Sequence, residues 1–223
     1  MNVLITGANR GIGLGFVEHY LKQGWQVWAC YRDDMLALKA LTSEKLHLVQ
    51  WDVTEQRPQQ GELPTQLDLL INNAGIYGPS KQAGQDFSSI TPETMMEVFR
   101  VDCVGVLQVT QTLRAALSKT QGRIANISSK MGSSADNSSG SCYAYRAAKA
   151  SLIIISKSMA IDLLDEGIKV VTLHPGWVQT DMTQHGGEIT VETSVNGMCK
   201  VIENIGTYPL GSLIAYDGEV IPF

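Results

Sequence analysis

Tyr145 and Lys149 lie four residues apart in the stretch SCYAYRAAKASLIIISKS, residues 141 to 158. Residues with this spacing lie on one face of a helix, about one turn apart, so the two side chains point into a common space. A phenol has an ordinary pKa of about 10 and is a poor acid–base group at neutral pH, but a nearby ammonium favours the phenolate. The pair therefore predicts acid–base catalysis by a tyrosine that a lysine tunes. The alternative is a solvated helix face, where such pairs are common.

A glycine-rich turn near the amino terminus has the composition of a phosphate site. The stretch LITGANRGIG places Gly7, Gly11 and Gly13 after an apolar run and before a helical segment. Glycine lets a phosphate approach the backbone, and the start of a helix supplies N–H donors and a partial positive charge. The standard G-x-G-x-x-G pattern is absent, because Phe16 occupies the place of its last glycine. A strand-to-helix turn that needs glycine only for its geometry is the alternative.

Two arginines favour a phosphate on the adenosine ribose of a dinucleotide. Arg32 follows the second apolar run, and Arg10 lies in the glycine turn. An acidic residue at the position of Arg32 would bind ribose hydroxyls, whereas arginine accommodates a 2′-phosphate. We therefore predict NADP(H) as the favoured cofactor and NAD(H) as its alternative. A surface ion pair of Arg32 with Asp33 or Asp34 is the competing explanation.

The elements that must position these residues alternate along the chain. Short β-branched runs are separated by segments of helical period, which predicts βαβ units and a parallel sheet. The predicted strands lie within residues 2–6, 26–30, 46–51, 67–72, 122–128, 168–175 and 211–216, and the helices at 12–23, 35–41, 91–117, 145–164 and 191–204. Strands this apolar are covered on both faces. We predict one α/β Rossmann domain over residues 1–223, with a doubly wound, mostly parallel sheet of about seven strands and ligands at their carboxyl ends.

Composition and charge exclude several classes of function. The 223 residues are 44% hydrophobic and 17% charged, which predicts a compact fold rather than a disordered chain. A net charge of −5 argues against nucleic acid or an anionic membrane as the main partner. The amino terminus has no signal-peptide pattern, so we expect a cytoplasmic protein. The four cysteines form no C-x-x-C pair, so no metal site is predicted.

Six segments, taken together, resemble the short-chain dehydrogenase/reductase family. They are TGANRGIG (residues 6–13), WDV (51–53), NNAG (72–75), NISS (126–129), YRAAK (145–149) and HPGWVQTDM (174–182), in the order that the family has them. The resemblance covers nearly the whole chain. The length, the YDGEVIPF ending and the brief segment after Met182 are most similar to the branch of C-factor proteins and sniffer-type carbonyl reductases.

The resemblance implies an NAD(P)-dependent oxidoreductase of the carbonyl reductase type, which transfers a hydride between NADP(H) and a carbonyl or alcohol substrate. Tyr145 would be the acid–base group, and Lys149 would hold the nicotinamide ribose and lower the pKa of the phenol. Ser129 would orient the substrate oxygen, with Ser128 as the nearby alternative. The cofactor would lie against Gly7, Asn9, Arg10, Gly11, Ile12, Gly13, Arg32, Asp52, Val53, Asn73, Ala74, Gly75, Tyr145, Lys149, Pro175, Gly176, Val178 and Thr180.

One position departs from the family pattern. The family has asparagine in a V-N-x-x-G context, bound to a water that links the lysine to solvent, whereas this chain has Asp102 in VDCVG. A carboxylate accepts hydrogen bonds but donates none, and its charge would neutralise Lys149 and raise the pKa of Tyr145. We therefore expect a reaction that is slow, is shifted to higher pH or relays its proton differently.

Partners and a rival function follow from the same resemblance. Trp177, Tyr77, Met131, Tyr143 and Met182 are expected around the mouth of the site for a small-molecule substrate. The loop at residues 133–141 is either a flap over that mouth or a plain connection, and His174 is expected to be structural. The apolar stripe of residues 150–164 predicts a homodimer or homotetramer. The rival function is an NAD(P)-binding signalling or regulatory protein, similar to C-factor, with little or no turnover.

Overall fold

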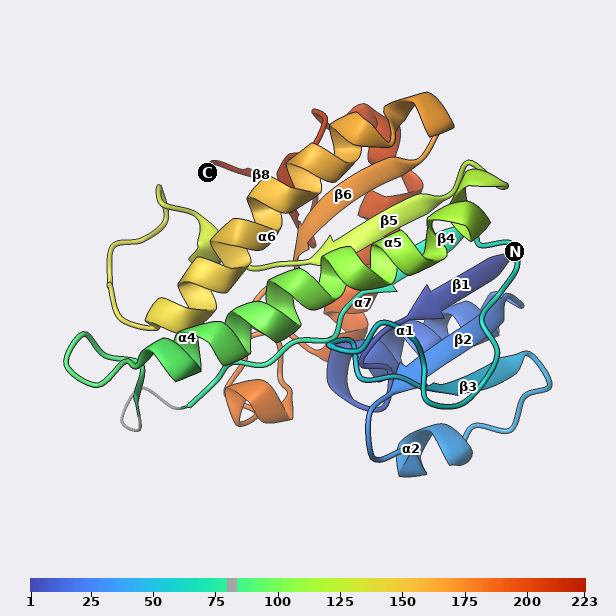
Figure 1. The fold of residues 1–223 in the computed structure, drawn as a ribbon, viewed down its shortest axis with the longest axis horizontal. Coiled ribbons are helices and arrows are strands. Elements are labelled where there is room, and N and C mark those ends of the chain that lie inside the picture. Colours follow the sequence, from blue (N-terminus) through green and yellow to red (C-terminus); the bar gives the residue numbers. More distant parts are fainter. Residues whose placement is uncertain (80–83) are drawn as a thin grey trace.

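Eight strands form one sheet in the part of the chain that the computed structural model describes, residues 1–79 and 84–223. Along the sheet the order is β3-β2-β1-β4-β5-β6-β7-β8 (Figure 1). The strands are β1 (Asn2–Ile5), β2 (Gln26–Tyr31), β3 (Leu46–Gln50), β4 (Leu69–Asn72), β5 (Arg123–Ile127), β6 (Lys169–His174), β7 (Leu213–Ala215) and β8 (Val220–Ile221).

The sheet is parallel except at one edge. Every neighbouring pair from β3 to β7 is parallel, and β8 pairs with β7 in the antiparallel direction. The strand order reverses at β1, which lies between β2 and β4. The predicted fold class, a doubly wound and mostly parallel sheet, is confirmed, and β8 is a short edge strand beyond the seven that the sequence predicted.

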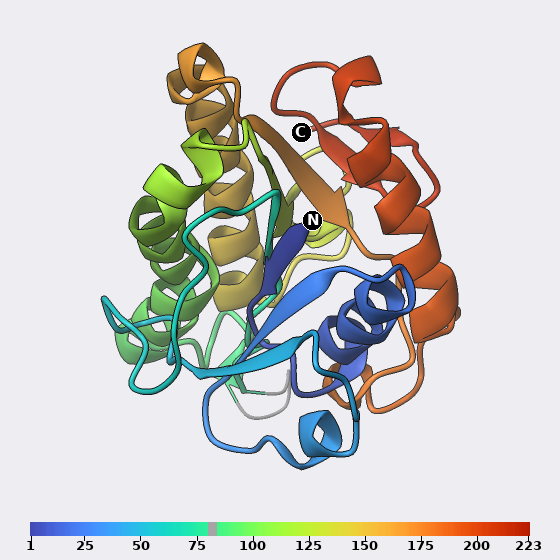
Figure 2. The ribbon, with the colours of Figure 1, turned by 90° about the vertical axis from the view of Figure 1, so that its right-hand side faces the viewer.

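Helices cover both faces of this sheet (Figure 2). The α1 and α7 helices pack together on one face, while α4, α5 and α6 lie on the other. The helices are α1 (Gly11–Lys22), α2 (Leu36–Lys39), α4 (Pro92–Phe99), α5 (Gly105–Ser118), α6 (Tyr143–Asp162) and α7 (Val191–Glu203), with short turns η1 (Arg100–Val104), η2 (Lys130–Gly132), η3 (Leu164–Glu166), η4 (Asp181–Thr183) and η5 (Ile205–Thr207). None of the helices in residues 1–79 and 84–223 is both long and apolar enough to cross a bilayer.

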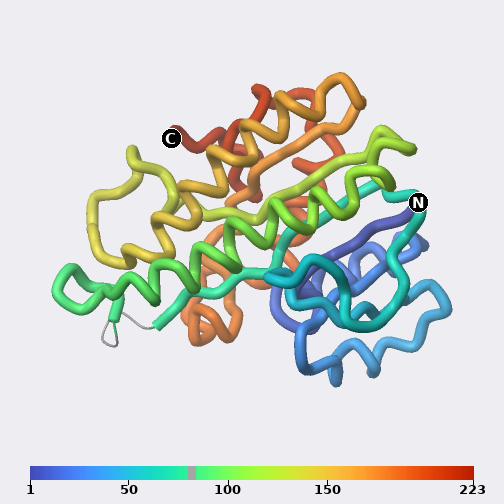
Figure 3. Tube along the Cα trace, in the orientation of Figure 1, coloured from blue at the N-terminus to red at the C-terminus, as the bar shows by residue number. Residues whose placement is uncertain are grey.

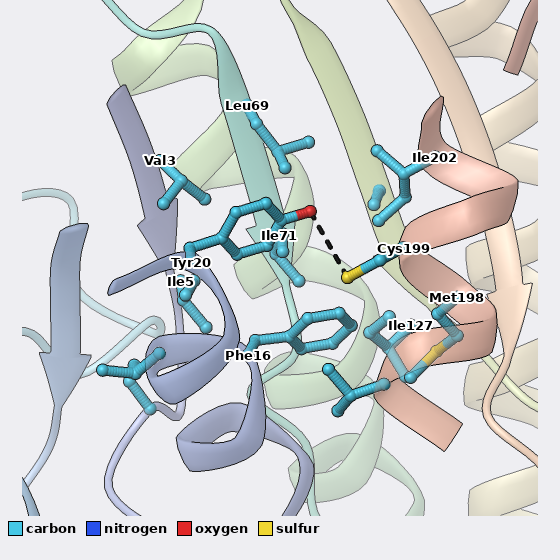
Figure 4. Close-up of a cluster of buried hydrophobic side chains, with 14 of the residues drawn as sticks. Val3, Ile5, Phe16, Tyr20, Leu69, Ile71, Ile127, Met198, Cys199 and Ile202 are labelled. Atoms are coloured by element: carbon cyan, nitrogen blue, oxygen red, sulfur yellow. Dashed lines mark hydrogen bonds between the residues drawn. The ribbon is translucent and has the colours of Figure 1, made fainter. Parts of the chain in front are cut away.

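The two faces of β1 show how the apolar strands bury themselves. Successive side chains of a strand point to opposite faces. Val3 and Ile5 therefore join the core beneath α1 and α7, while Leu4 joins the core beneath α5 and α6. Figure 4 shows the first of these cores, where Phe16 and Tyr20 of α1 face residues of α7 on the same side of the sheet.

The long helix predicted at residues 91–117 is in fact three segments. Thr91 caps α4 by accepting a hydrogen bond from the Thr94 N–H, and Pro92 occupies its first turn. The helix is then interrupted by η1, a π-helical turn, before α5 begins at Gly105. Such π turns inside helices often occur at functional sites, and Asp102 lies in this one.

The connections that follow β4, β5 and β6 gather at one end of the molecule. The tube in Figure 3 shows this end, where the η2 turn that follows β5 packs against α6. Parallel strands end at the same edge of a sheet, so residues far apart in sequence meet there.

Candidate active site

A cleft of about 470 Å³ opens at the carboxyl ends of β1, β2 and β4 and reaches the first turns of α6. It lies at the point where the strand order reverses, the usual ligand position in a doubly wound sheet. The predicted cofactor residues that line it are Gly7, Asn9, Arg10, Gly11, Ile12, Arg32, Asp52, Val53, Asn73, Ala74, Gly75, Tyr145, Lys149, Pro175 and Thr180.

Gly13, Gly176 and Val178 are not among the residues that line this cleft. A Cβ at Gly13 would lie 2.1 Å from the Gly7 carbonyl oxygen, so glycine is needed there for packing. A Cβ at Gly176 would meet Ile189, and the Val178 side chain is buried. These three residues support the wall of the cleft, and their contact with a cofactor stays a prediction.

The start of α1 has the features of an anion site. Gly7 has a φ of +61°, which an L side chain rarely adopts, and a Cβ there would lie 2.8 Å from the Ala74 Cα. The Asn73 side chain holds the turn by donating to the carbonyl oxygens of Thr6 and Gly7 at 3.0 and 3.1 Å. No side chain caps α1, and its first turn contains no acidic residue. The N–H groups and the positive end of this helix therefore face the cleft, where they suit a phosphate.

Both predicted phosphate ligands line the cleft, but each is paired with a carboxylate. Arg32 Nε donates to Asp33 Oδ2 at 2.6 Å, and Arg10 Nη1 lies 3.5 Å from Asp181 Oδ2. The competing explanation for Arg32, a surface pair with Asp33, is therefore present in the structure. Exposed pairs of this kind contribute only about 0–1 kcal/mol, so either guanidinium can exchange its partner for a phosphate.

Tyr145 and Lys149 share one space, as their spacing predicted. Both residues are buried in the first turns of α6, and the Lys149 Nζ lies 5.5 Å from the centroid of the Tyr145 ring. The same ammonium donates to the Ile127 carbonyl oxygen at 3.1 Å. The alternative of a solvated helix face is excluded for this pair, because Lys149 is only 4% exposed.

Asp102 contacts this lysine directly. Its Oδ2 lies 2.9 Å from Lys149 Nζ, and its Oδ1 accepts a hydrogen bond from the Ile76 N–H at 2.7 Å. The carboxylate is fully buried. A Cβ at Gly75 would lie 3.1 Å from Asp102 Oδ2 and 3.3 Å from Lys149 Nζ, so glycine leaves the room for this ion pair. At the position where the family has asparagine, this chain therefore has one partner of a buried ion pair.

This ion pair opposes the tuning that the sequence predicted for the tyrosine. Burial raises the pKa of Tyr145, the Lys149 ammonium lowers it, and Asp102 raises it again. The directions predicted for Lys149 and Asp102 are therefore both present, but burial outweighs the lysine, and the net direction of the Tyr145 pKa is upward. For Lys149, burial lowers the pKa, whereas Asp102 and Tyr145 raise it. The two raising effects outweigh burial, so the net direction of the Lys149 pKa is upward. At neutral pH the site therefore contains a lysine cation and a protonated phenol.

The two candidate serines differ in their partners. The Ser128 hydroxyl is buried and donates to the Lys149 carbonyl oxygen at 3.0 Å, which commits its proton to α6. The Ser129 Oγ accepts from the Met131 N–H at 3.1 Å, and hydrogen bonding from Ser129 lowers the pKa of the Tyr145 phenol. Ser128 is among the residues that line the cleft and Ser129 is not, so the choice of Ser129 as the serine at the phenol stays a prediction.

A sequence model of the short chain dehydrogenase family matches residues 1–190. The chain belongs to the short-chain dehydrogenase family. This dehydrogenase is 38% identical to the C-signal protein of Myxococcus xanthus over 159 residues, which are 70% of this chain and 93% of that protein.

Solved structures give the same result. The NADPH-bound carbonyl reductase from chicken fatty liver is 32% identical and superposes with a TM-score of 0.89, covering 100% of this chain and 98% of that one. The carbonyl reductase Sniffer of D. melanogaster is 26% identical, with a TM-score of 0.88 and coverage of 100% and 99%. The predicted resemblance to the branch of C-factor and sniffer-type proteins is confirmed.

Aromatic side chains lie beside the tyrosine of this dehydrogenase. The ring centroids of Tyr77 and Tyr145 are 4.9 Å apart, and the Tyr77 hydroxyl lies 2.8 Å from Cys142 Sγ. Tyr143 is partly exposed, with its ring 6.1 Å from that of Phe87. Of the other residues predicted at the mouth, Met182 lines the cleft, Trp177 is exposed, and Met131 is half-buried in the η2 turn. Phe87 and Cys142 were not predicted, because no local pattern marks them.

The loop at residues 133–141 is held to α6 by the arginine of the YRAAK segment. Arg146 donates to the carbonyl oxygens of Met131, Gly140 and Ser141 and to the Ser139 hydroxyl. These bonds hold the two ends of the loop to α6, and the two alternatives that the sequence left open, a flap or a plain connection, both stay predictions.

His174 does not have the properties of a catalytic base. Burial lowers its pKa to about 4, so the ring is neutral at neutral pH. Its Nδ1 is buried and has no hydrogen-bond partner. In the described residues, 1–79 and 84–223, no three His, Cys, Asp or Glu side chains form a group that could hold a metal ion.

Proposed function

We propose that this short-chain dehydrogenase is a carbonyl reductase that prefers NADP(H), acting on small carbonyl or alcohol compounds. The observation that carries the proposal is the buried Lys149 cation beside Tyr145, with an open cleft in front of both. A protein that only binds a dinucleotide could use Lys149 for the ribose, but it has no use for a buried phenol beside that cation. A phenol next to a buried ammonium is the arrangement expected of an acid–base group.

The residues of the cleft fit a dinucleotide. The uncapped start of α1 suits its pyrophosphate, and Arg10 and Arg32 lie on the same wall for a 2′-phosphate. Ala74 and Gly75 line the cleft with little or no side chain next to Lys149, which leaves room for a ligand there. Lys149 would hold the nicotinamide ribose. When bound, the reduced nicotinamide supplies a hydride to the substrate carbon.

The side chains of this chain supply position and a proton. Ser129 donates to the substrate oxygen and orients it toward the Tyr145 hydroxyl. In reduction, negative charge develops on that oxygen and Tyr145 transfers its proton to it. The Lys149 cation stabilises the phenolate that is left, because it lies close to the ring in a buried site. The raised pKa of Tyr145 keeps the phenol protonated at neutral pH, so the group is in the form that donates a proton in reduction.

A second candidate function has its own support. The similarity to C-signal favours a signalling or regulatory protein that binds NAD(P) with little turnover. The Asp102–Lys149 ion pair also fits this candidate, because it opposes formation of the phenolate. The presence of Ser129, Tyr145 and Lys149 together favours the enzyme.

The two candidates are separated by NADPH oxidation measured against a panel of aldehydes, ketones and quinones. The wild-type chain should turn over at least one class, and Tyr145→Phe should lose about 100-fold or more while still binding NADPH. The enzyme proposal fails if the wild type binds NADPH but oxidises it no faster than Tyr145→Phe with every compound of the panel.

We also propose that the chain forms a homodimer or homotetramer through α5 and α6. Ile154 and Ile161 of α6 are 52% and 54% exposed, and they lie two turns apart on that helix. Sedimentation of the wild type and of Ile154→Asp tests this, since the substitution should release monomers.

A further inference from the structure

Gln85 is fully buried between the segment after β4 and the start of α6. Its Nε2 donates to the carbonyl oxygens of Tyr77 and Pro79 at 2.7 and 2.9 Å. Its Oε1 accepts from the Tyr145 N–H at 3.3 Å, and its own carbonyl oxygen accepts from the Cys142 N–H at 3.0 Å. Both amide donors and one lone pair are thus used in a dry environment, where unpaired groups are costly.

The chemistry of these partners requires an amide at this position. Two carbonyl oxygens face the nitrogen, and one N–H faces the oxygen. A carboxylate of the same shape would place a negative oxygen against those two carbonyls. A thioether of similar length would keep the packing but leave both carbonyls and the Tyr145 N–H unpaired.

The hydrogen bonds of the Gln85 side chain form a clamp between Tyr77 and Tyr145, and Tyr145 lines the cleft. One end holds the backbone of Tyr77, whose ring packs 4.9 Å from the Tyr145 ring. The other end satisfies the N–H of Tyr145 in the first turn of α6, where no intrahelical partner exists. The Tyr77 hydroxyl meets Cys142 in the same turn, which closes a ring of contacts between the two segments.

We propose that Gln85 is a positioning residue that sets the Tyr77 ring against Tyr145 and thereby makes the site select flat, unsaturated carbonyl compounds over branched aliphatic ones. This inference rests on the proposed reductase function. A flat ring packs against the face of Tyr77 within reach of the Tyr145 hydroxyl, whereas a branched chain does not fill that space. A shift of about 1 Å in such a wall changes rates by up to about 100-fold.

The test compares Gln85→Met and Gln85→Glu with Ser156→Ala as a control. Ser156 is also buried in α6, where its Oγ accepts from Asn126 Nδ2 at 2.9 Å, and it is not among the residues that line the cleft. For each chain we would measure NADPH affinity, kcat and KM with an aryl ketone and with a branched aliphatic ketone, and hydrogen exchange of the Tyr145 and Cys142 amides.

Gln85→Met should lower kcat/KM about 10-fold or more for the aryl ketone, much less for the aliphatic one, and leave NADPH affinity within a factor of about three. Exchange of the two amides should rise at least tenfold. Gln85→Glu should show a larger loss that is partly relieved at acidic pH, where the introduced carboxyl gains a proton and can donate to one carbonyl. Ser156→Ala should leave the kcat/KM values, the NADPH affinity and the exchange of the two amides unchanged.

The proposal would be overturned if Gln85→Met had the wild-type ratio of kcat/KM for the aryl ketone to kcat/KM for the aliphatic ketone, together with a stability loss like that of Ser156→Ala. Gln85 would then be a structural residue. Unchanged amide exchange would also overturn the proposal. If the wild type itself reduces no compound, the proposed function fails, and the amide exchange still decides whether Gln85 clamps the two segments.

Discussion

Replacing Asp102 by asparagine tests the effect of the buried ion pair on the tyrosine. The substitution keeps the size of the side chain and removes the charge that lies 2.9 Å from Lys149 Nζ. Because Asp102 raises the pKa of Tyr145, its removal should lower that pKa. In alcohol oxidation, where the phenolate is the active form, the rising limb of the pH–rate profile should move to lower pH.

The distances give the size of the shift. The carboxylate lies 2.9 Å from an ammonium that is itself 5.5 Å from the Tyr145 ring centroid, so the carboxylate is about 8 Å or less from that ring. Two unit charges about 8 Å apart interact by about 2 kcal/mol at an effective dielectric constant near 20, which corresponds to between about one and two pKa units. The variant should also lose about 3–5 kcal/mol of stability, because Lys149 is left buried without its counter-ion.

The assay is the pH dependence of alcohol oxidation by the wild type and by Asp102→Asn, together with urea unfolding of both. Asp68→Asn is the matched control, since its carboxylate accepts a hydrogen bond from the Asn2 N–H near the start of β4, far from the cleft. A limb that stays in place, or moves to higher pH, would refute the reasoning. The upward shift would mean that Lys149 loses its proton when Asp102 is removed.

Three further predictions concern the cofactor, the histidine and the glycine turn. Arg32→Ala should weaken NADPH binding about tenfold and NADH binding much less, measured by titration of both cofactors, and an equal loss for both would contradict the 2′-phosphate assignment. The pKa of His174 falls from 6.5 to about 4 on folding, so between these pH values the residue binds its proton mainly in the unfolded state. The free energy of unfolding should therefore fall by about 3 kcal/mol as the pH drops from 6.5 to 4. Urea unfolding of His174→Asn at both pH values should show a loss that is smaller by that amount. Gly13→Ala should lower stability by about 1–3 kcal/mol in thermal unfolding and weaken NADPH binding, because the added Cβ collides with Gly7 and Asn73, whereas full wild-type stability would show that the turn can yield.

Much of the site could be predicted because its parts are local in the sequence. The spacing of Tyr145 and Lys149 places them on one helix face wherever that helix lies, and the glycine turn follows directly from β1 into α1. The alternation of apolar strands and helices likewise predicted the doubly wound sheet. The outer bounds of the helix predicted at residues 91–117 were right to within one residue, but its interruption by η1 was missed, since a π-helical turn has no periodic pattern of its own.

Contacts between distant segments were decided only by the tertiary structure. The sequence by itself determined which residues could carry a proton, bind a phosphate and form the sheet. Only the fold brought Asp102 onto Lys149, turned Arg10 toward Asp181 and buried Gln85 between Tyr77 and Tyr145. The physical reason is that the pKa of Tyr145 depends on burial and on charges within a few ångströms, and those neighbours come from other strands and helices.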